Sequence, residues 1–151
     1  MKPMRGFTLI EVMIALVIVA ILGSLAVASY QGFVRESNRS EAWSLLLQIQ
    51  SGEEKYFLQN STYTANLTAA PTAGGLGLNL NLSGGNLYTP DGLYSLSIAT
   101  VACAGGGGGL CSYTATANAA NGQLKDTASC QVFTINSLGQ RTPADSTGCW
   151  R

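Results

Sequence analysis

Histidine is absent from this sequence, and charged residues make up only 11% of its 151 positions. Histidine is the commonest general acid–base group in enzymes, and the carboxylates here form no cluster that would replace it. The formal net charge is zero, which argues against a generic polycation, and the 46% of hydrophobic residues argue against a disordered tail. The composition therefore predicts a protein that is not an enzyme and has no catalytic residues, metal site or cofactor.

Cysteine is missing from the first two thirds of the chain and occurs only as Cys103, Cys111, Cys130 and Cys149. Without histidine or a C-x-x-C spacing, these residues do not form a zinc motif. Disulfides are the expected state, and four cysteines allow three complete pairings. The five glycines between Cys103 and Cys111 are not followed by the Gly-Lys-Ser/Thr of a phosphate-binding loop, so we interpret them as a surface turn.

Charge is also missing from one long segment, because no charged residue occurs from Val12 to Val34. As a helix this segment is roughly 35 Å long, enough to cross a hydrocarbon core of about 30 Å. Lys2 and Arg5 precede it without an acidic residue, which predicts a cytoplasmic N-terminus and an outward location beyond Arg35. The cysteines then lie on the oxidising side of the membrane, where disulfides form.

The helix is expected to continue outside the membrane as an amphipathic segment. Apolar or small residues recur there at spacings of three and four: Ala42, Leu45, Ile49, Gly52 and Tyr56. This period is that of a helix with one face against a partner layer. A single helix from Phe7 to about Asn60 is therefore predicted, with a length of roughly 80 Å.

The rest of the chain has the pattern of a small sheet. Residues 61–86, rich in Thr, Ala, Asn, Leu and Gly, are expected to form a surface loop with room for a short strand. Alternating runs then predict strands at 93–100, 112–117 and 131–135, a turn at 136–139 and a last short strand at 140–142. Period two predicts an antiparallel sheet with one buried face, so the fold class is α+β.

A lone carboxylate near the membrane is the most informative feature of the N-terminal region. Residues 1–6 form a basic leader that is too short for an ordinary secretory signal, and Glu11 follows inside the apolar helix. An ionisable group at membrane depth costs a few kcal/mol, so it marks a functional site unless the side chain reaches headgroups or water. From placement alone, both interpretations of Glu11 stay open.

The string KPMRGFTLIEVMIALVIVAILGSLAVASYQ resembles the N-terminal region of type IV prepilins and of the related pseudopilins of type II secretion. The resemblance implies that a prepilin peptidase cuts between Gly6 and Phe7 and methylates the new amine of Phe7. It also implies that Glu11 attracts the Phe7 amine of a neighbouring subunit during assembly. The chain would then consist of a leader at 1–6, a transmembrane and filament-core segment at 7–34, and an outward domain at 35–151.

The same resemblance implies the type IV pilin fold, a long N-terminal helix packed on a small antiparallel sheet with a disulfide-bonded C-terminal loop. It favours a Cys130–Cys149 disulfide for that loop, and Cys103–Cys111 would then close a hairpin. One departure concerns the helix. Many pilins carry proline before the Ser-Tyr pair, whereas Ala28 precedes Ser29 and Tyr30 here, so the proline that helps to unwind such helices is missing.

The strings EEKYFLQNSTYT and TINSLGQRT, with Cys149-Trp150 at the end, resemble the smaller pilins of the minor class. This resemblance implies a structural subunit of a type IV pilus that serves pilus biogenesis, motility or adhesion. Its partners would be other pilin subunits, the prepilin peptidase and the inner-membrane assembly machinery. The protein would span the inner membrane once before assembly and belong to the extracellular pilus afterwards.

Three alternative functions stay open: a major pilin, a pseudopilin of type II secretion, and a minor pilin that binds DNA for uptake. Loss of Lys2 and Arg5 with the leader would reduce eight basic residues to six, against eight acidic ones. An excess of acidic over basic side chains is unfavourable for binding DNA phosphates. Only a local convergence of Lys125, Arg141 and Arg151 would favour binding.

Overall fold

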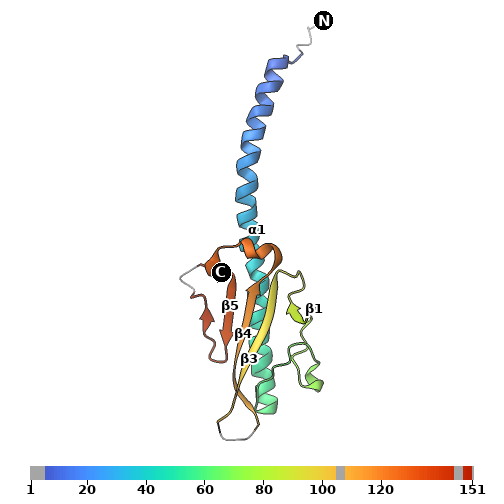
Figure 1. The fold of residues 1–151 in the computed structure, drawn as a ribbon, viewed down its shortest axis with the longest axis vertical. Helices are drawn as coiled ribbons and strands as arrows, with labels where there is room; N and C mark the ends of the chain where they lie inside the picture. The colour runs from blue at the N-terminus through green and yellow to red at the C-terminus, as the bar shows by residue number, and fades with distance from the viewer. Residues whose placement is uncertain (1–5, 105–107, 145–147, 151) are drawn as a thin grey trace. The chain divides into compact units, whose positions relative to one another are not determined.

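The computed structural model describes residues 6–104, 108–144 and 148–150 (Figure 1). The leader up to Arg5, part of the predicted glycine turn and Arg151 lie outside these residues. The chain divides between Val34 and Arg35 into two compact units, and we call the second unit the head. Helix α1, Leu9–Asn60, begins in the first unit and ends in the head.

The first unit contains a continuous stretch of apolar helix. The backbone is helical through Ala28, where the missing proline leaves every backbone donor in place. The most apolar 18-residue window has a mean hydropathy of 2.7, and its length and composition are sufficient to cross a membrane. Within this unit the large apolar side chains are exposed, from Leu9 at 78% to Phe33 at 71%.

Helix α1 ends where a side chain and the N–H of a left-handed residue donate hydrogen bonds to carbonyls of the last turn. Asn60 Nδ2 donates to the Tyr56 carbonyl at 3.0 Å, and the Ser61 N–H donates to the Phe57 carbonyl at 2.7 Å. Ser61 has φ of 54°, the left-handed conformation that commonly closes a helix. The predicted helix is thus confirmed, with its start two residues later than expected and its end at Asn60.

The head contains a six-stranded antiparallel sheet in the order β1-β2-β3-β4-β5-β6. Its strands are β1 Asn81–Ser83, β2 Asn86–Tyr88, β3 Tyr94–Ala102, β4 Leu110–Ala119, β5 Val132–Asn136 and β6 Arg141–Thr142. Short 3-10 helices lie between them at η1 Pro71–Ala73, η2 Asn121–Lys125 and η3 Ala128–Cys130. The α+β fold class and the four predicted strands are confirmed, whereas β2 was not predicted as a strand.

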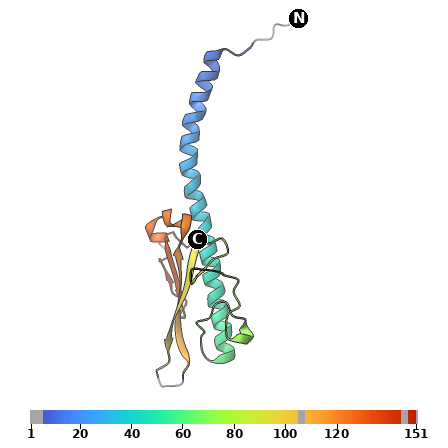
Figure 2. The same ribbon diagram turned by 45° about the vertical axis from the view of Figure 1, so that its right-hand side comes forward.

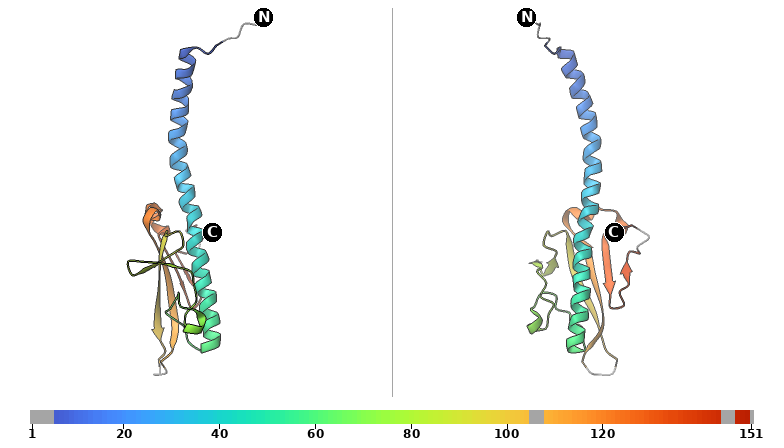
Figure 3. Two further views of the ribbon diagram at one scale, coloured as in Figure 1. Left: turned by 90° about the vertical axis from the view of Figure 1, so that its right-hand side faces the viewer. Right: turned by 180° about the vertical axis from the view of Figure 1, so that it is seen from behind.

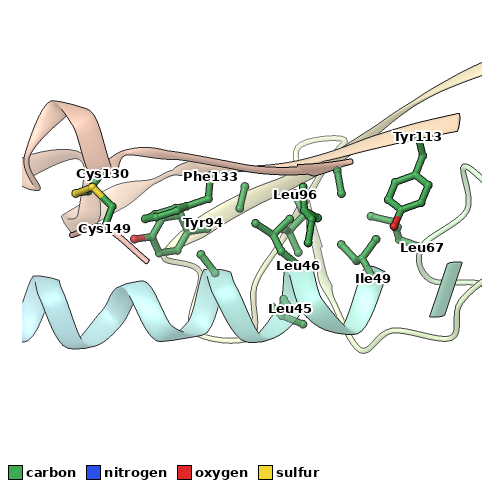
Figure 4. Packing of buried hydrophobic residues seen from close by; sticks show 14 residues of the cluster. Leu45, Leu46, Ile49, Leu67, Tyr94, Leu96, Tyr113, Cys130, Phe133 and Cys149 are labelled. Carbon is green, nitrogen blue, oxygen red and sulfur yellow. A yellow bond between two sulfur atoms is a disulfide. The ribbon is translucent and has the colours of Figure 1, made fainter. Parts of the chain in front are cut away.

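One face of the sheet packs on the head portion of α1 (Figures 2 and 3). The inward residues of the three central strands alternate as expected, and the register aligns Leu96 with Ala117 and Ala117 with Phe133. Small alanines on the central strand β4 leave room for Leu46 and Ile49, which point from α1 toward the sheet (Figure 4). Each such fully buried side chain stabilises the head by roughly 1.5–3 kcal/mol.

The loop between α1 and β1 contributes to this core in a way that its composition did not predict. Leu67 is 2% exposed, and Leu76, Leu78 and Leu80 are partly buried against the core. The leucines that alternate with Gly and Asn from 76 to 80 therefore pack against the core, although this segment is not a strand.

Candidate functional site

The predicted processing junction lies immediately before the first turn of α1. Gly6, Phe7 and Thr8 have no regular secondary structure, and the Phe7 side chain is 86% exposed. A Cβ placed on Gly6 would have no neighbour within 4 Å. The backbone around the Gly6–Phe7 bond is therefore unobstructed by the described part of the chain.

Glu11 and Thr8 form a reciprocal cap at the helix start. The Thr8 N–H donates to Glu11 Oε2 at 3.3 Å, the Thr8 hydroxyl donates to the same oxygen at 3.2 Å, and the Glu11 N–H donates to Thr8 Oγ1 at 3.4 Å. This capping box satisfies backbone donors that the first turn leaves unpaired, and the carboxylate also faces the positive end of the helix dipole. Sequence reasoning missed the cap, although the Thr-x-x-Glu spacing is its signal.

The other carboxylate oxygen of Glu11 remains available. Among the described residues, Glu11 Oε1 makes no hydrogen bond, and Phe7, Glu11 and Ala15 line one shallow hollow along the helix. The side chain is thus held by one oxygen at the edge of an apolar surface, while the other can accept from a second group. Such a group would have to come from outside the described chain.

In the head, a buried ion pair joins α1 to the segment after β4. Arg39 Nε and Nη2 donate to Asp126 Oδ2 and Oδ1, both at 2.8 Å, and both residues are only 9% exposed. Gln123 Nε2 donates to Asp126 Oδ2 and to the Arg35 carbonyl, each at 2.9 Å. The Thr127 N–H donates to Asp126 Oδ1 at 2.8 Å.

These contacts shift the acidity of both partners. The hydrogen bond to Asp126 raises the pKa of the Arg39 guanidinium above its usual value. Burial by itself would raise the pKa of Asp126, but the hydrogen bonds from Arg39 and the Thr127 N–H outweigh it and hold that pKa below its usual range. The pair is therefore ionised at neutral pH, and it fastens η2 to the helix.

A second buried carboxyl, Glu53, holds the loop that follows α1. Its Oε2 accepts the Thr64 N–H at 3.0 Å, whereas its Oε1 is buried without a hydrogen-bond partner among the described residues. Burial raises the pKa of Glu53, and the Thr64 N–H offsets part of that rise. Burial, and then the charge of Glu53, raise the pKa of the Tyr113 hydroxyl, whose oxygen is also unpartnered there.

Arg39 and Glu53 were missed as buried residues by sequence reasoning, but a signal existed. Arg39 precedes Ala42 by three positions, and Glu53 follows Ile49 by four, so both lie on the apolar stripe of the helix. A charged residue on that stripe indicates a buried partner.

Two disulfides are present, Cys103–Cys111 and Cys130–Cys149. The first lies where the β3–β4 hairpin closes, and the second ties the C-terminal segment to η3. Trp150, next to Cys149, stacks on Trp43 of α1 at 6.4 Å between ring centroids, and the Arg141 guanidinium lies 5.3 Å from the Trp150 ring. Stacking and cation–π contact therefore attach the C-terminal segment to the helix.

Of the three cations named from the sequence, the two in the described residues make different contacts. Arg141 lies on Trp150, whereas the Lys125 carbonyl accepts a hydrogen bond from Arg35 Nη1 at 3.1 Å. Arg151 lies outside the described residues. The structure thus brings the backbone of Lys125 into contact with Arg35, a residue that was not considered for this role.

The chain combines a long apolar N-terminal helix, a glutamate close to a Gly-Phe junction and a head in which the helix packs on an antiparallel sheet. This combination is that of a type IV pilin. A model described as a prokaryotic N-terminal methylation motif matches residues 1–27. The model described as "Type IV minor pilin ComP, DNA uptake sequence receptor" matches residues 28–134, well over half of the chain. The chain belongs to this minor pilin family, which is a structural family and not an enzyme family.

Curated relatives include both pilins and pseudopilins. The type II secretion system core protein G of Escherichia coli K12 is 35% identical over 86 residues, which cover 53% of this chain and 59% of that protein. The type IV major pilin protein PilE1 of Neisseria gonorrhoeae is 38% identical over 69 residues, covering 46% of this chain and 42% of PilE1. The chain thus spans about half the length of the curated relatives it matches.

A solved type IV pilin from Shewanella oneidensis has a similar fold. The TM-score is 0.51 at 20% sequence identity, and the match covers 78% of this chain and 98% of that one. At this identity the likeness supports the architecture alone.

Proposed function

We propose that this chain is a minor subunit of a type IV pilus. A prepilin peptidase cuts it after Gly6 and methylates Phe7, and the segment 7–34 holds it in the inner membrane with residues from Arg35 on facing outward. The assembly machinery then transfers the chain into a filament of pilin subunits. The observation that supports this most strongly is the helix start, where one available carboxylate oxygen lies close to the Gly6–Phe7 junction and is followed by the uncharged stretch Val12–Val34.

In this proposal, Glu11 acts by charge. The methylated amine of Phe7 is cationic near neutral pH, and a carboxylate from a neighbouring subunit would offset part of the cost of removing that charge from water. The exposed apolar side chains of the first unit face lipid before assembly and equivalent helices afterwards, with shape and van der Waals contact as the main attraction.

Three substitutions separate this charge from the helix cap. Glu11→Gln keeps an acceptor for Thr8 but removes the charge. Thr8→Ala removes the two hydroxyl hydrogen bonds of the cap but keeps the charge, and Glu36→Ala removes an exposed carboxylate farther along α1. We expect all three proteins in the membrane, with only Glu11→Gln poorly incorporated into sheared pili. Normal incorporation of Glu11→Gln, or a loss equal to it in Thr8→Ala, would contradict the charge mechanism.

DNA binding is a second candidate function. It is supported by the description of the family as a DNA uptake sequence receptor and by the contact of Arg35 with the backbone carbonyl of a second basic residue, Lys125. The experiment is a gel shift with the full-length processed chain in detergent. A shift that weakens with salt and with Lys125→Ala is expected if DNA binds there, whereas no shift at low salt would exclude this function.

A further inference from the structure

A groove of about 350 Å³ lies in the head between the last turns of α1 and the loop that contains η1. In Figures 2 and 3 this loop lies beside the end of α1. Gly52 and Gly75 line the groove. A Cβ on Gly52 would make an ordinary van der Waals contact with Leu76 Cδ1 at 3.5 Å, whereas a Cβ on Gly75 would clash with the Ala69 carbonyl, so the close turn of the loop requires glycine at 75. The volume is at the small end of ligand sites and suits a single sugar ring.

The loop wall of the groove is braced by its own hydrogen bonds. The Gly77 N–H donates to the Ala69 carbonyl at 2.7 Å, and the Leu76 N–H donates to the Asn66 carbonyl at 3.0 Å. The Thr64 hydroxyl donates to the Gly74 carbonyl at 2.7 Å. Because the wall is formed before a ligand arrives, binding would cost little ordering of the backbone.

The polar side chains along the groove are not used by the fold. Lys55, Tyr56 and Gln59 lie within two turns of α1, and their side chains make no hydrogen bond or ion pair among residues 6–104, 108–144 and 148–150. Lys55 supplies a cation, Tyr56 a hydroxyl and Gln59 both a donor and an acceptor. Leu76 adds an apolar wall beside them. The groove can therefore bind a ligand that has one negative charge, several hydroxyls and an apolar ring face.

The charges around the groove select among anionic ligands. Among the described residues that line the groove, Lys55 alone is cationic, and Glu54 precedes it in the helix. Arg35, whose guanidinium donates to the Lys125 carbonyl, lies roughly 30 Å from Lys55 along the helix, at about 1.5 Å per residue. A polyanion gains affinity from several phosphate contacts, whereas a single carboxylate requires only one cation.

We propose that this groove binds a single hexuronic acid residue at the end of a glycan chain. The sugar carboxylate pairs with Lys55, ring hydroxyls bond to Tyr56 and Gln59, and the apolar face of the ring lies on Leu76. The filament would thereby adhere to glycans that end in such a residue. This activity is separate from processing at Gly6–Phe7 and from incorporation through Glu11.

The test is ligand-observed NMR on the full-length processed chain in detergent micelles. The probes are methyl glucuronide and methyl glucoside, which differ in the carboxylate, and the variants are Lys55→Met, Lys55→Arg and the matched control Lys125→Met. We expect saturable binding of the glucuronide and binding about tenfold weaker for the glucoside and for Lys55→Met, the scale of one charge-assisted hydrogen bond. Lys55→Arg and Lys125→Met should bind the glucuronide as the unmodified chain does.

Any of three results would overturn the proposal: no saturable binding of the glucuronide, equal binding by Lys55→Met, or displacement of the glucuronide by a short oligonucleotide at lower concentration. The last would assign the groove to nucleic acid. Because methylation of Phe7 and recovery in sheared pili are measured independently, failure here is distinguishable from failure of the pilin function.

Discussion

Removal of the Asp126 carboxylate tests how η2 is attached to α1 within the head. Asp126→Ala deletes both hydrogen bonds from Arg39, together with those from Gln123 and the Thr127 N–H. The Arg39 guanidinium then keeps its buried position without a counter-charge. We expect the 3-10 segment η2 to loosen from the helix as a result.

The expected cost follows from the burial of the pair. Breaking a buried ion pair on one side typically costs about 3–5 kcal/mol, because an uncompensated charge remains. Arg39 and Asp126 are each 9% exposed, so some water reaches them, and we expect the lower end, about 3 kcal/mol. Against a domain stability of about 5–15 kcal/mol, this is a large fraction.

The assay is urea unfolding of the full chain in detergent micelles, followed by tryptophan fluorescence. Both tryptophans, Trp43 and Trp150, lie in the head and report its unfolding. The expected loss lowers the urea midpoint by about 2 M, for a slope of about 1.5 kcal/mol per molar. Glu54→Ala, which removes an exposed carboxylate, is the control and should change stability by less than about 0.5 kcal/mol.

The pH dependence gives a second check on the same pair. Because the pKa of Asp126 is lowered in the fold, its contribution is present above the ordinary carboxyl range and is lost as pH falls through the folded pKa. The difference between the unmodified chain and Asp126→Ala should therefore be constant near neutral pH and shrink in strong acid. A neutral-pH loss below about 1 kcal/mol, the size of an exposed pair, would refute the reasoning.

Other substitutions test the remaining contacts of the head. Glu53→Gln keeps an acceptor for Thr64. The raised pKa of Glu53 means that ionisation of its carboxyl opposes folding. This variant should therefore have a higher urea midpoint than the unmodified chain at pH 7 and lose that advantage in acid. An equal effect at both pH values would contradict this sign. Trp150→Ala removes the stack on Trp43 and should lower the free energy of unfolding by about 2 kcal/mol, with a red shift of Trp43 emission. An unchanged urea midpoint and emission spectrum would show that this stack does not hold the C-terminal segment.

The parts of the fold that the sequence predicted are those with a strong period. Leu45 and Ile49 recur at helical spacing, and Tyr94, Leu96 and Phe133 belong to alternating runs, so each pattern indicates its own buried face. Strand β2 lacks such a period because it has only three residues, and pairing with β3 defines it. Its existence depends on tertiary contacts that no local pattern carries.

The head contacts that sequence reasoning missed are long-range. Arg39 and Asp126 are 87 positions apart, and Trp43 meets Trp150 across most of the head. The residues around Arg39 and around Asp126 do not indicate which residue each one pairs with. The position of Arg39 on the apolar stripe indicates only that a partner exists. The capping box at Thr8 and Glu11 is different, because both residues and their spacing are local and the motif was overlooked.

The central claim is that this chain is processed as a pilin subunit at the junction before α1. Mass spectrometry of the N-terminal peptide, from the protein purified out of cells, tests it directly. The account predicts a mature chain that begins with N-methylated Phe7. A chain that still begins with Met1 and retains the leader through Gly6 would contradict it.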